Sequence, residues 1–82
     1  MSYYVYVLKS IEKKTVTYVG YTNNLSKRIK LHNSGKGAKF TKGRKWRVIY
    51  KEKLPSKSEA ISREYYIKNN RKLRNEIKNI YK

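Results

Sequence analysis

The chain has 82 residues, no cysteine and a formal net charge of +17, from 22 Lys and Arg against 5 Asp and Glu. This length allows one domain over residues 1–82 with a thin core, and the lack of cysteine excludes disulfides and thiolate metal sites. The apolar run at residues 3–8 is short and lacks the basic leader of a signal peptide, and no stretch approaches the roughly 20 apolar residues that span a bilayer, so we expect a cytoplasmic protein without membrane association.

Two segments near the start predict a β-hairpin. Residues 3–8 and 16–21 are rich in β-branched and aromatic side chains, as strands are. The polar residues 9–15 between them predict a loop.

The register that we assume for this hairpin pairs Leu8 with Val16. Tyr6 then faces Tyr18 on one side of the sheet, because side chains alternate along a strand. Gly20 leaves space beside the two rings. Taken alone, such a pair of tyrosines is ordinary cross-strand packing.

The next elements are a helix, a loop and a third strand. Residues 25–33 predict a helix that is capped by Asn23 or Asn24 and ended by the glycine that follows it. Residues 35–45 are basic and rich in glycine, and predict a flexible loop. Residues 46–50 predict the third strand.

The rest of the chain predicts two helices. Ser56 at the N-cap and Glu59 three positions later form a capping box for a helix that runs to about Lys68. Asn69 and Asn70 interrupt it, and a last helix runs to the end of the chain. The pattern β-β-α-β-α-α predicts an α+β fold, in which a small three-stranded antiparallel sheet is flanked by helices.

Two charged residues fall on helix faces that are otherwise apolar. At about 100° per residue, Arg28 lies within the apolar arc of its helix, with His32 beside it. Glu64 projects among three apolar residues of its own helix, Ala60, Ile61 and Ile67. Arg28 and Glu64 either form a partly buried ion pair, which often adds little stability, or both face a functional site.

The order of these residues resembles the GIY-YIG nuclease family. The motif Tyr4-Val5-Tyr6 is followed by Tyr18-Val19-Gly20, then by Arg28, by His32 four positions later, and by Glu64. The resemblance covers nearly the whole chain and is greatest to the small single-domain bacterial members, which are also similar to the nuclease module of the excision-repair incision subunit. Tyr4 stands where the family's first motif has glycine.

The resemblance implies an endonuclease that hydrolyses phosphodiester bonds with one Mg²⁺ or Mn²⁺ ion, and the sequence gives no sign of an organic cofactor. Glu64 would hold the metal, and Arg28 would neutralise charge that develops on the phosphate. Tyr18, assisted by Tyr6 or His32, would orient or deprotonate the attacking water. Which of these three side chains is the general base stays open.

The high positive charge favours nucleic acid as the partner, because phosphate binding releases counterions. The candidate phosphate contacts in the basic loop are Lys36, Lys39, Lys42, Arg44 and Lys45. Contacts to the backbone tolerate many sequences, so we expect low specificity, with DNA favoured over RNA, and a monomeric protein. The aromatic residues expected to serve mainly in packing are Trp46, Tyr50, Tyr65 and Tyr66, although any that are exposed could instead stack on bases.

Two other functions fit the sequence. One is a DNA- or RNA-binding module of the same fold with little or no catalytic activity. The other, suggested by size and charge, is a small ribosome-associated RNA-binding protein. The joint presence of Tyr6, Tyr18, Arg28, His32 and Glu64 favours the nuclease, because a pure binder has no need of a lone glutamate among phosphate-facing groups.

Overall fold

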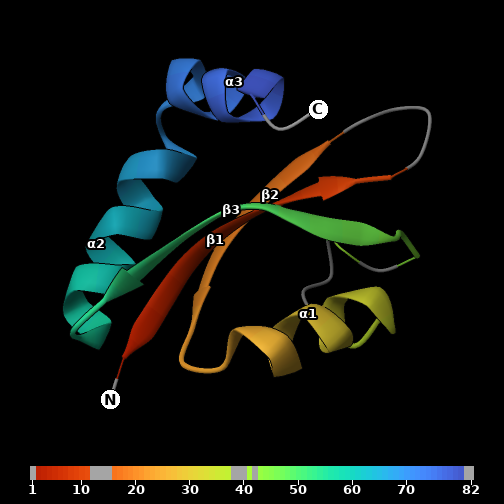
Figure 1. Cartoon of the computed structure of the whole chain (residues 1–82), viewed down its shortest axis with the longest axis horizontal. Helices are drawn as coiled ribbons and strands as arrows, with labels where there is room; N and C mark the ends of the chain where they lie inside the picture. The colour runs from red at the N-terminus through yellow and green to blue at the C-terminus, as the bar shows by residue number, and fades with distance from the viewer. Residues whose placement is uncertain (1, 12–15, 38–40, 42, 81–82) are drawn as a thin grey trace.

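The computed structural model describes residues 2–11, 16–37, 41 and 43–80. The elements in chain order are β1 (Tyr3–Ser10), β2 (Thr17–Thr22), α1 (Leu25–Asn33), β3 (Trp46–Leu54), α2 (Lys57–Lys68) and α3 (Arg71–Ile80). The three strands form one antiparallel sheet in the order β2-β1-β3 (Figure 1). The α+β class and the predicted order of elements are therefore confirmed.

The register of the β1–β2 hairpin differs from the expected one. Leu8 pairs with Tyr18, and Tyr6 pairs with Gly20, not with Tyr18. The shift is two residues, and an even shift keeps every side chain on its predicted face. Tyr6 and Tyr18 therefore still share one face of the sheet, as diagonal neighbours with ring centroids 6.5 Å apart.

Helices cover both faces of the sheet (Figure 1). On one face, Val5 and Val7 of β1 pack against Ala60 and Ile67 of α2 and Ile77 of α3. On the other face, a second cluster underlies α1, and its members are Tyr6, Leu8 and Trp46 with Val16, Tyr18, Leu25, Ile29 and Val48 packed around them. Because side chains alternate along β1, this strand contributes residues to both clusters.

Strand β3 is longer than the predicted 46–50, because Lys51 and Lys53 continue the ladder to Leu54. Lysines are disfavoured inside sheets but suit an edge strand, where they discourage pairing with other chains. Val7 pairs with Tyr50 whereas Leu8 pairs with Val48, so the strand contains a β-bulge at this point.

The predicted helix caps are present. The Asn24 side chain accepts a hydrogen bond from the Lys27 backbone N–H at 3.1 Å, and Ser56 accepts one from Glu59 N–H at 3.3 Å. The break after Lys68 has the same origin, because the Asn70 side chain accepts from Leu73 N–H at 3.0 Å and so begins α3.

Several expected packing residues are on the surface. Tyr65 and Tyr66 of α2 are 69% and 51% exposed, so the expectation that these two serve mainly in packing is wrong, and Ile61, on the apolar face of the predicted helix, is 43% exposed. Trp46 is buried, as expected. Helix α2 contacts the core through Ala60 and Ile67, and its larger apolar side chains lie outside this contact.

Candidate active site

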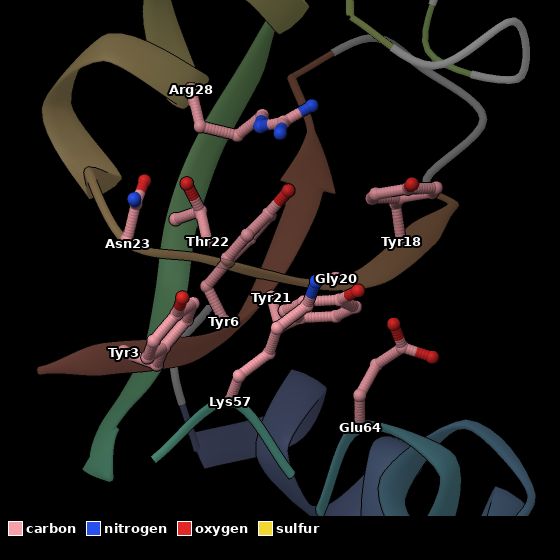
Figure 2. A pocket seen from close by; sticks show the side chains of 10 residues that line it. All are labelled: Tyr3, Tyr6, Tyr18, Gly20, Tyr21, Thr22, Asn23, Arg28, Lys57 and Glu64. Carbon is pink, nitrogen blue, oxygen red and sulfur yellow. The ribbon is translucent and has the colours of Figure 1, made fainter. Parts of the chain in front are cut away.

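A pocket of about 410 Å³ opens beside the edge strand β2. Its lining residues come from β1, β2, the turn that follows β2, α1 and α2, and are Tyr3, Tyr6, Tyr18, Gly20, Tyr21, Thr22, Asn23, Arg28, Lys57 and Glu64. Figure 2 shows Arg28 approaching from one side and Glu64 and Lys57 from the other, with Tyr6 and Tyr18 between them. The pocket therefore joins four of the five candidate catalytic residues.

Gly20 allows Tyr6 to reach this pocket from the central strand. A Cβ at Gly20 would lie 2.6 Å from Tyr6 Oη and 2.8 Å from its Cζ. The phenol ring therefore crosses the β2 backbone at the residue that has no side chain. Any larger residue there would displace the ring.

His32 does not line the pocket but lies beneath it. The imidazole is fully buried, with Nε2 at 2.8 Å from Tyr6 Oη and Nδ1 at 2.8 Å from Thr41 Oγ1. Gly37 packs so closely on the ring that a Cβ at this position would overlap it. His32 therefore contacts Tyr6 and holds its hydroxyl in place, whereas Arg28, one turn earlier on α1, faces the pocket.

The environment keeps the two phenols and the imidazole neutral near pH 7. Burial raises the pKa of Tyr6, and the neighbouring Tyr18 adds to this effect. Burial and then the Glu64 carboxylate raise the pKa of Tyr18, against an opposing effect of Arg28. Burial and the positive charge of Arg28 both lower the pKa of His32.

Arg28 and Glu64 do not form the ion pair that was the structural alternative. Among the described residues, the ion pair within 4.0 Å joins Arg63 Nε to Glu52 Oε1 at 3.0 Å, away from the pocket. The Arg28 side chain is exposed and Glu64 is half-buried at the pocket wall (Figure 2). Both charges are therefore available to groups that enter the pocket.

Glu64 is the acidic group that a metal could use here. No cluster of three or more His, Cys, Asp or Glu side chains occurs in the part of the chain that the structure describes. A single carboxylate fits Mg²⁺, which commonly takes one or two protein carboxylates and completes its shell with water and substrate phosphate.

The described residues of the basic loop do not line the pocket. Lys36 and Lys45 are exposed and Arg44 is half-buried, and none of the three lines the pocket, while Lys39 and Lys42 lie outside the described residues. The loop is nevertheless connected to the site, because Thr41 bonds His32.

Sequence reasoning missed Lys57 and Thr41. Lys57 precedes Glu64 by two helical turns, so helical periodicity alone places the two side chains on one face. Thr41 carries no comparable signal, because its bond to His32 depends on how the loop folds. Along the described ranges, no helix has the length and apolar character needed to cross a membrane.

Comparison with known proteins agrees with this architecture. Residues 2–78 match the model of the GIY-YIG catalytic domain. The UPF0213 protein CPE1444 of Clostridium perfringens is 56% identical over 66 residues, which cover 79% of this chain and 69% of that protein. The UPF0213 protein YazA of Bacillus subtilis is 44% identical over 81 residues, which cover 98% of this chain and 77% of that one.

A solved structure shares the fold. The solution NMR structure of the UPF0213 protein BH0048 from Bacillus halodurans aligns with a TM-score of 0.57 and 40% identity, over 98% of this chain and 85% of that one. The family match covers almost the entire sequence and includes every residue of the pocket. The chain therefore belongs to the GIY-YIG family, alongside the small UPF0213 proteins.

Proposed function

We propose that this protein is a metal-dependent endonuclease that hydrolyses phosphodiester bonds in DNA with low sequence specificity. The observation that carries the proposal is the pocket beside β2, where a guanidinium and a carboxylate that form no ion pair within the described part of the chain lie on either side of two phenols. A scissile phosphate needs a cation on one side and a metal ligand on the other, and this arrangement supplies both.

Arg28 is the group that would bind the phosphate. It is exposed at the pocket and forms no ion pair with the acidic residues of the described chain. Its planar guanidinium can donate two parallel hydrogen bonds to phosphate oxygens. These bonds strengthen as negative charge develops in the transition state, so Arg28 would contribute to catalysis as well as to binding.

Glu64 would hold one Mg²⁺ or Mn²⁺ ion. When bound, such an ion polarises the phosphate and stabilises charge on the leaving oxygen. A single protein carboxylate gives weak metal affinity by itself, since water would supply most of the ion's other ligands.

Tyr18 and Tyr6 would orient the attacking water, and His32 would act through Tyr6. In one neutral tautomer, His32 Nδ1–H donates a hydrogen bond to Thr41 Oγ1, and His32 Nε2 accepts a hydrogen bond from the Tyr6 hydroxyl. Tyr6 is then fixed as a hydroxyl whose oxygen can accept a further hydrogen bond from a neighbour. Tyr18 is less buried than Tyr6 and is the phenol better placed to exchange a proton with solvent.

The raised pKa values of the two phenols favour a second candidate, a nucleic-acid-binding module with weak activity. Protonated phenols are poor general bases at neutral pH. The two candidates differ in what Glu64 does, because a binder gains nothing from a carboxylate near phosphate. The positive charge of the chain suits either function, and under both we expect DNA or RNA backbone as the ligand and a monomeric protein.

The proposal is tested by cleavage of branched, nicked, single-stranded and duplex DNA with Mg²⁺ or Mn²⁺. Arg28→Ala is expected to reduce cleavage by about 100- to 1,000-fold, as the loss of a transition-state donor does. Lys30→Ala is the matched control, because Lys30 is another exposed cation of α1 but does not line the pocket. Equal effects of the two substitutions would show that Arg28 supplies charge alone.

A further inference from the structure

Helix α2, which lines the pocket through Lys57 and Glu64, also exposes the large apolar side chains of Ile61 and Tyr65. Ile61 is 43% exposed and Tyr65 is 69% exposed. Tyr65 directly follows Glu64, a pocket residue, in the sequence. Exposed apolar side chains that adjoin a polar site commonly mark a binding surface.

Helical geometry places these two residues on the pocket side of α2. At about 100° per residue, four residues follow Glu64 in one direction around the helix and lie within about 100° of it. Their order is Lys57, Lys68, Ile61 and Tyr65. The core-facing residues Ala60 and Ile67 are reached from Glu64 by rotating around the helix in the opposite direction. A stripe therefore leads from the carboxylate, past two lysines, to an isoleucine and a tyrosine that face solvent.

The neighbouring Tyr66 differs from Tyr65 in its surroundings. Tyr66 is also exposed, but its ring is covered by the Arg63 guanidinium at 5.0 Å, and it borders a separate hollow with Leu54 and Pro55. The Tyr65 ring has no such contact among the described residues. Tyr65 thus has an open aromatic face beside the pocket, and Tyr66 provides a matched control on the same helix.

We propose that Ile61 and Tyr65 form a stacking surface for an unpaired nucleobase of DNA, next to the phosphate that the pocket holds. This inference rests on the proposed function and narrows its substrate class. Lys57 and Lys68 would follow the phosphates, and the ring would cover a base, which is how proteins combine cations with aromatic side chains to bind single strands.

The substrate follows from this geometry. A base inside a duplex has both faces covered by its neighbours, so it cannot stack on Tyr65. The flanking nucleotide must be unpaired, and the substrate is therefore DNA with a single-stranded segment, flap or branch at the cleavage site.

The test measures binding to a single-stranded DNA oligonucleotide and to the duplex of the same sequence, using the full chain with Glu64→Gln so that the DNA stays intact. In this background, Tyr65→Ala is expected to weaken single-strand binding by about 5- to 100-fold, the range for loss of one stacked base. Duplex binding should change less than about twofold, because the phosphate contacts remain.

Two controls separate stacking from other effects. Tyr65→Phe keeps the aromatic face and should bind as the parent does, and Tyr66→Ala should leave binding unchanged. A 2-aminopurine placed in the single strand should be quenched by the parent protein and by Tyr65→Phe, but not by Tyr65→Ala. A further oligonucleotide carries an abasic nucleotide where 2-aminopurine is quenched. It should bind the parent protein as weakly as the intact strand binds Tyr65→Ala. This control does not depend on the stability of the variant.

These readouts need no cleavage, so they distinguish failure of the stacking surface from failure of the nuclease proposal. The inference is overturned if Tyr65→Ala leaves single-strand binding unchanged, or weakens single-strand and duplex binding equally. It is also overturned if Tyr66→Ala has the same effect as Tyr65→Ala, since the loss would then reflect general surface chemistry.

Discussion

Tyr6 Oη lies 2.8 Å from His32 Nε2, although 26 positions separate the two residues in the sequence. The bond joins the central strand to α1 beneath the pocket, and Thr41 completes the chain of contacts at His32 Nδ1. All three residues are buried. The orientation of a pocket-lining phenol therefore depends on an imidazole that solvent does not reach.

This burial makes the stability of the protein sensitive to acid. The folded-state pKa of His32 is lowered, so the unfolded chain binds the proton more readily. The stabilising contribution of the neutral, buried His32 is complete above the pKa of an unfolded histidine, about 6.5, and is lost as the pH falls below that value. Stability in urea should decrease from pH 7 to pH 5.5, by at most about 1.4 kcal/mol per pH unit below 6.5.

The sequence contains one histidine, which makes this prediction specific. His32→Gln keeps polar groups in place but does not titrate, so its stability should be nearly constant over the same interval. A pH slope that persists in His32→Gln would assign the effect to other groups.

Gly20→Ala should disturb both the site and the fold. The added Cβ would meet Tyr6 Oη and Cζ and Tyr18 Cε2 at distances of 2.6, 2.8 and 3.1 Å. Overpacking of this kind costs about 1–3 kcal/mol, and displacement of Tyr6 should reduce cleavage. Urea unfolding measures the first effect and DNA cleavage the second.

A double-mutant cycle identifies the cause. In a Tyr6→Leu background, Gly20→Ala should cost clearly less stability, because the nearest clashing atoms are gone. If the two substitutions were simply additive, the close approach of Tyr6 to Gly20 would not be responsible.

The two charges at the pocket should shift the pKa of Tyr18 in opposite directions. The Glu64 carboxylate raises this pKa and Arg28 lowers it. Glu64→Gln should therefore lower the pKa of Tyr18, and Arg28→Ala should raise it further. Carbon-13 NMR titration of labelled tyrosine follows the change, with Tyr18→Phe used for assignment and Glu59→Gln as a control that leaves the pKa unaltered.

The helices could be predicted from sequence because their signals are local. Asn24, Ser56 and Asn70 each cap a helix through a backbone N–H three residues further along the chain, and such contacts need no knowledge of the tertiary fold. The faces of β1 were predicted for the same reason, since alternation along a strand is a local property.

The hairpin register and the role of His32 could not be predicted in this way. A two-residue slip leaves the inward and outward pattern unchanged, so the sequence does not distinguish pairing of Tyr6 with Tyr18 from pairing with Gly20. His32 lies next to Arg28 on a helical wheel, but tertiary packing buries one and exposes the other. The motif spacing predicts that both residues belong to one site, but it does not indicate which of them lines the pocket.

Glu64→Gln tests most directly whether the pocket beside β2 is catalytic. Cleavage and binding of the same DNA should be measured with Mg²⁺ or Mn²⁺ for this variant and for Glu59→Gln, which neutralises an exposed acid of the same helix outside the pocket. Glu64→Gln should abolish cleavage while binding stays within about threefold of the parent, as expected when a metal ligand is lost but the phosphate-binding cations remain. Glu59→Gln should cleave normally. Undiminished cleavage by Glu64→Gln, or an equal loss in both variants, would contradict the account.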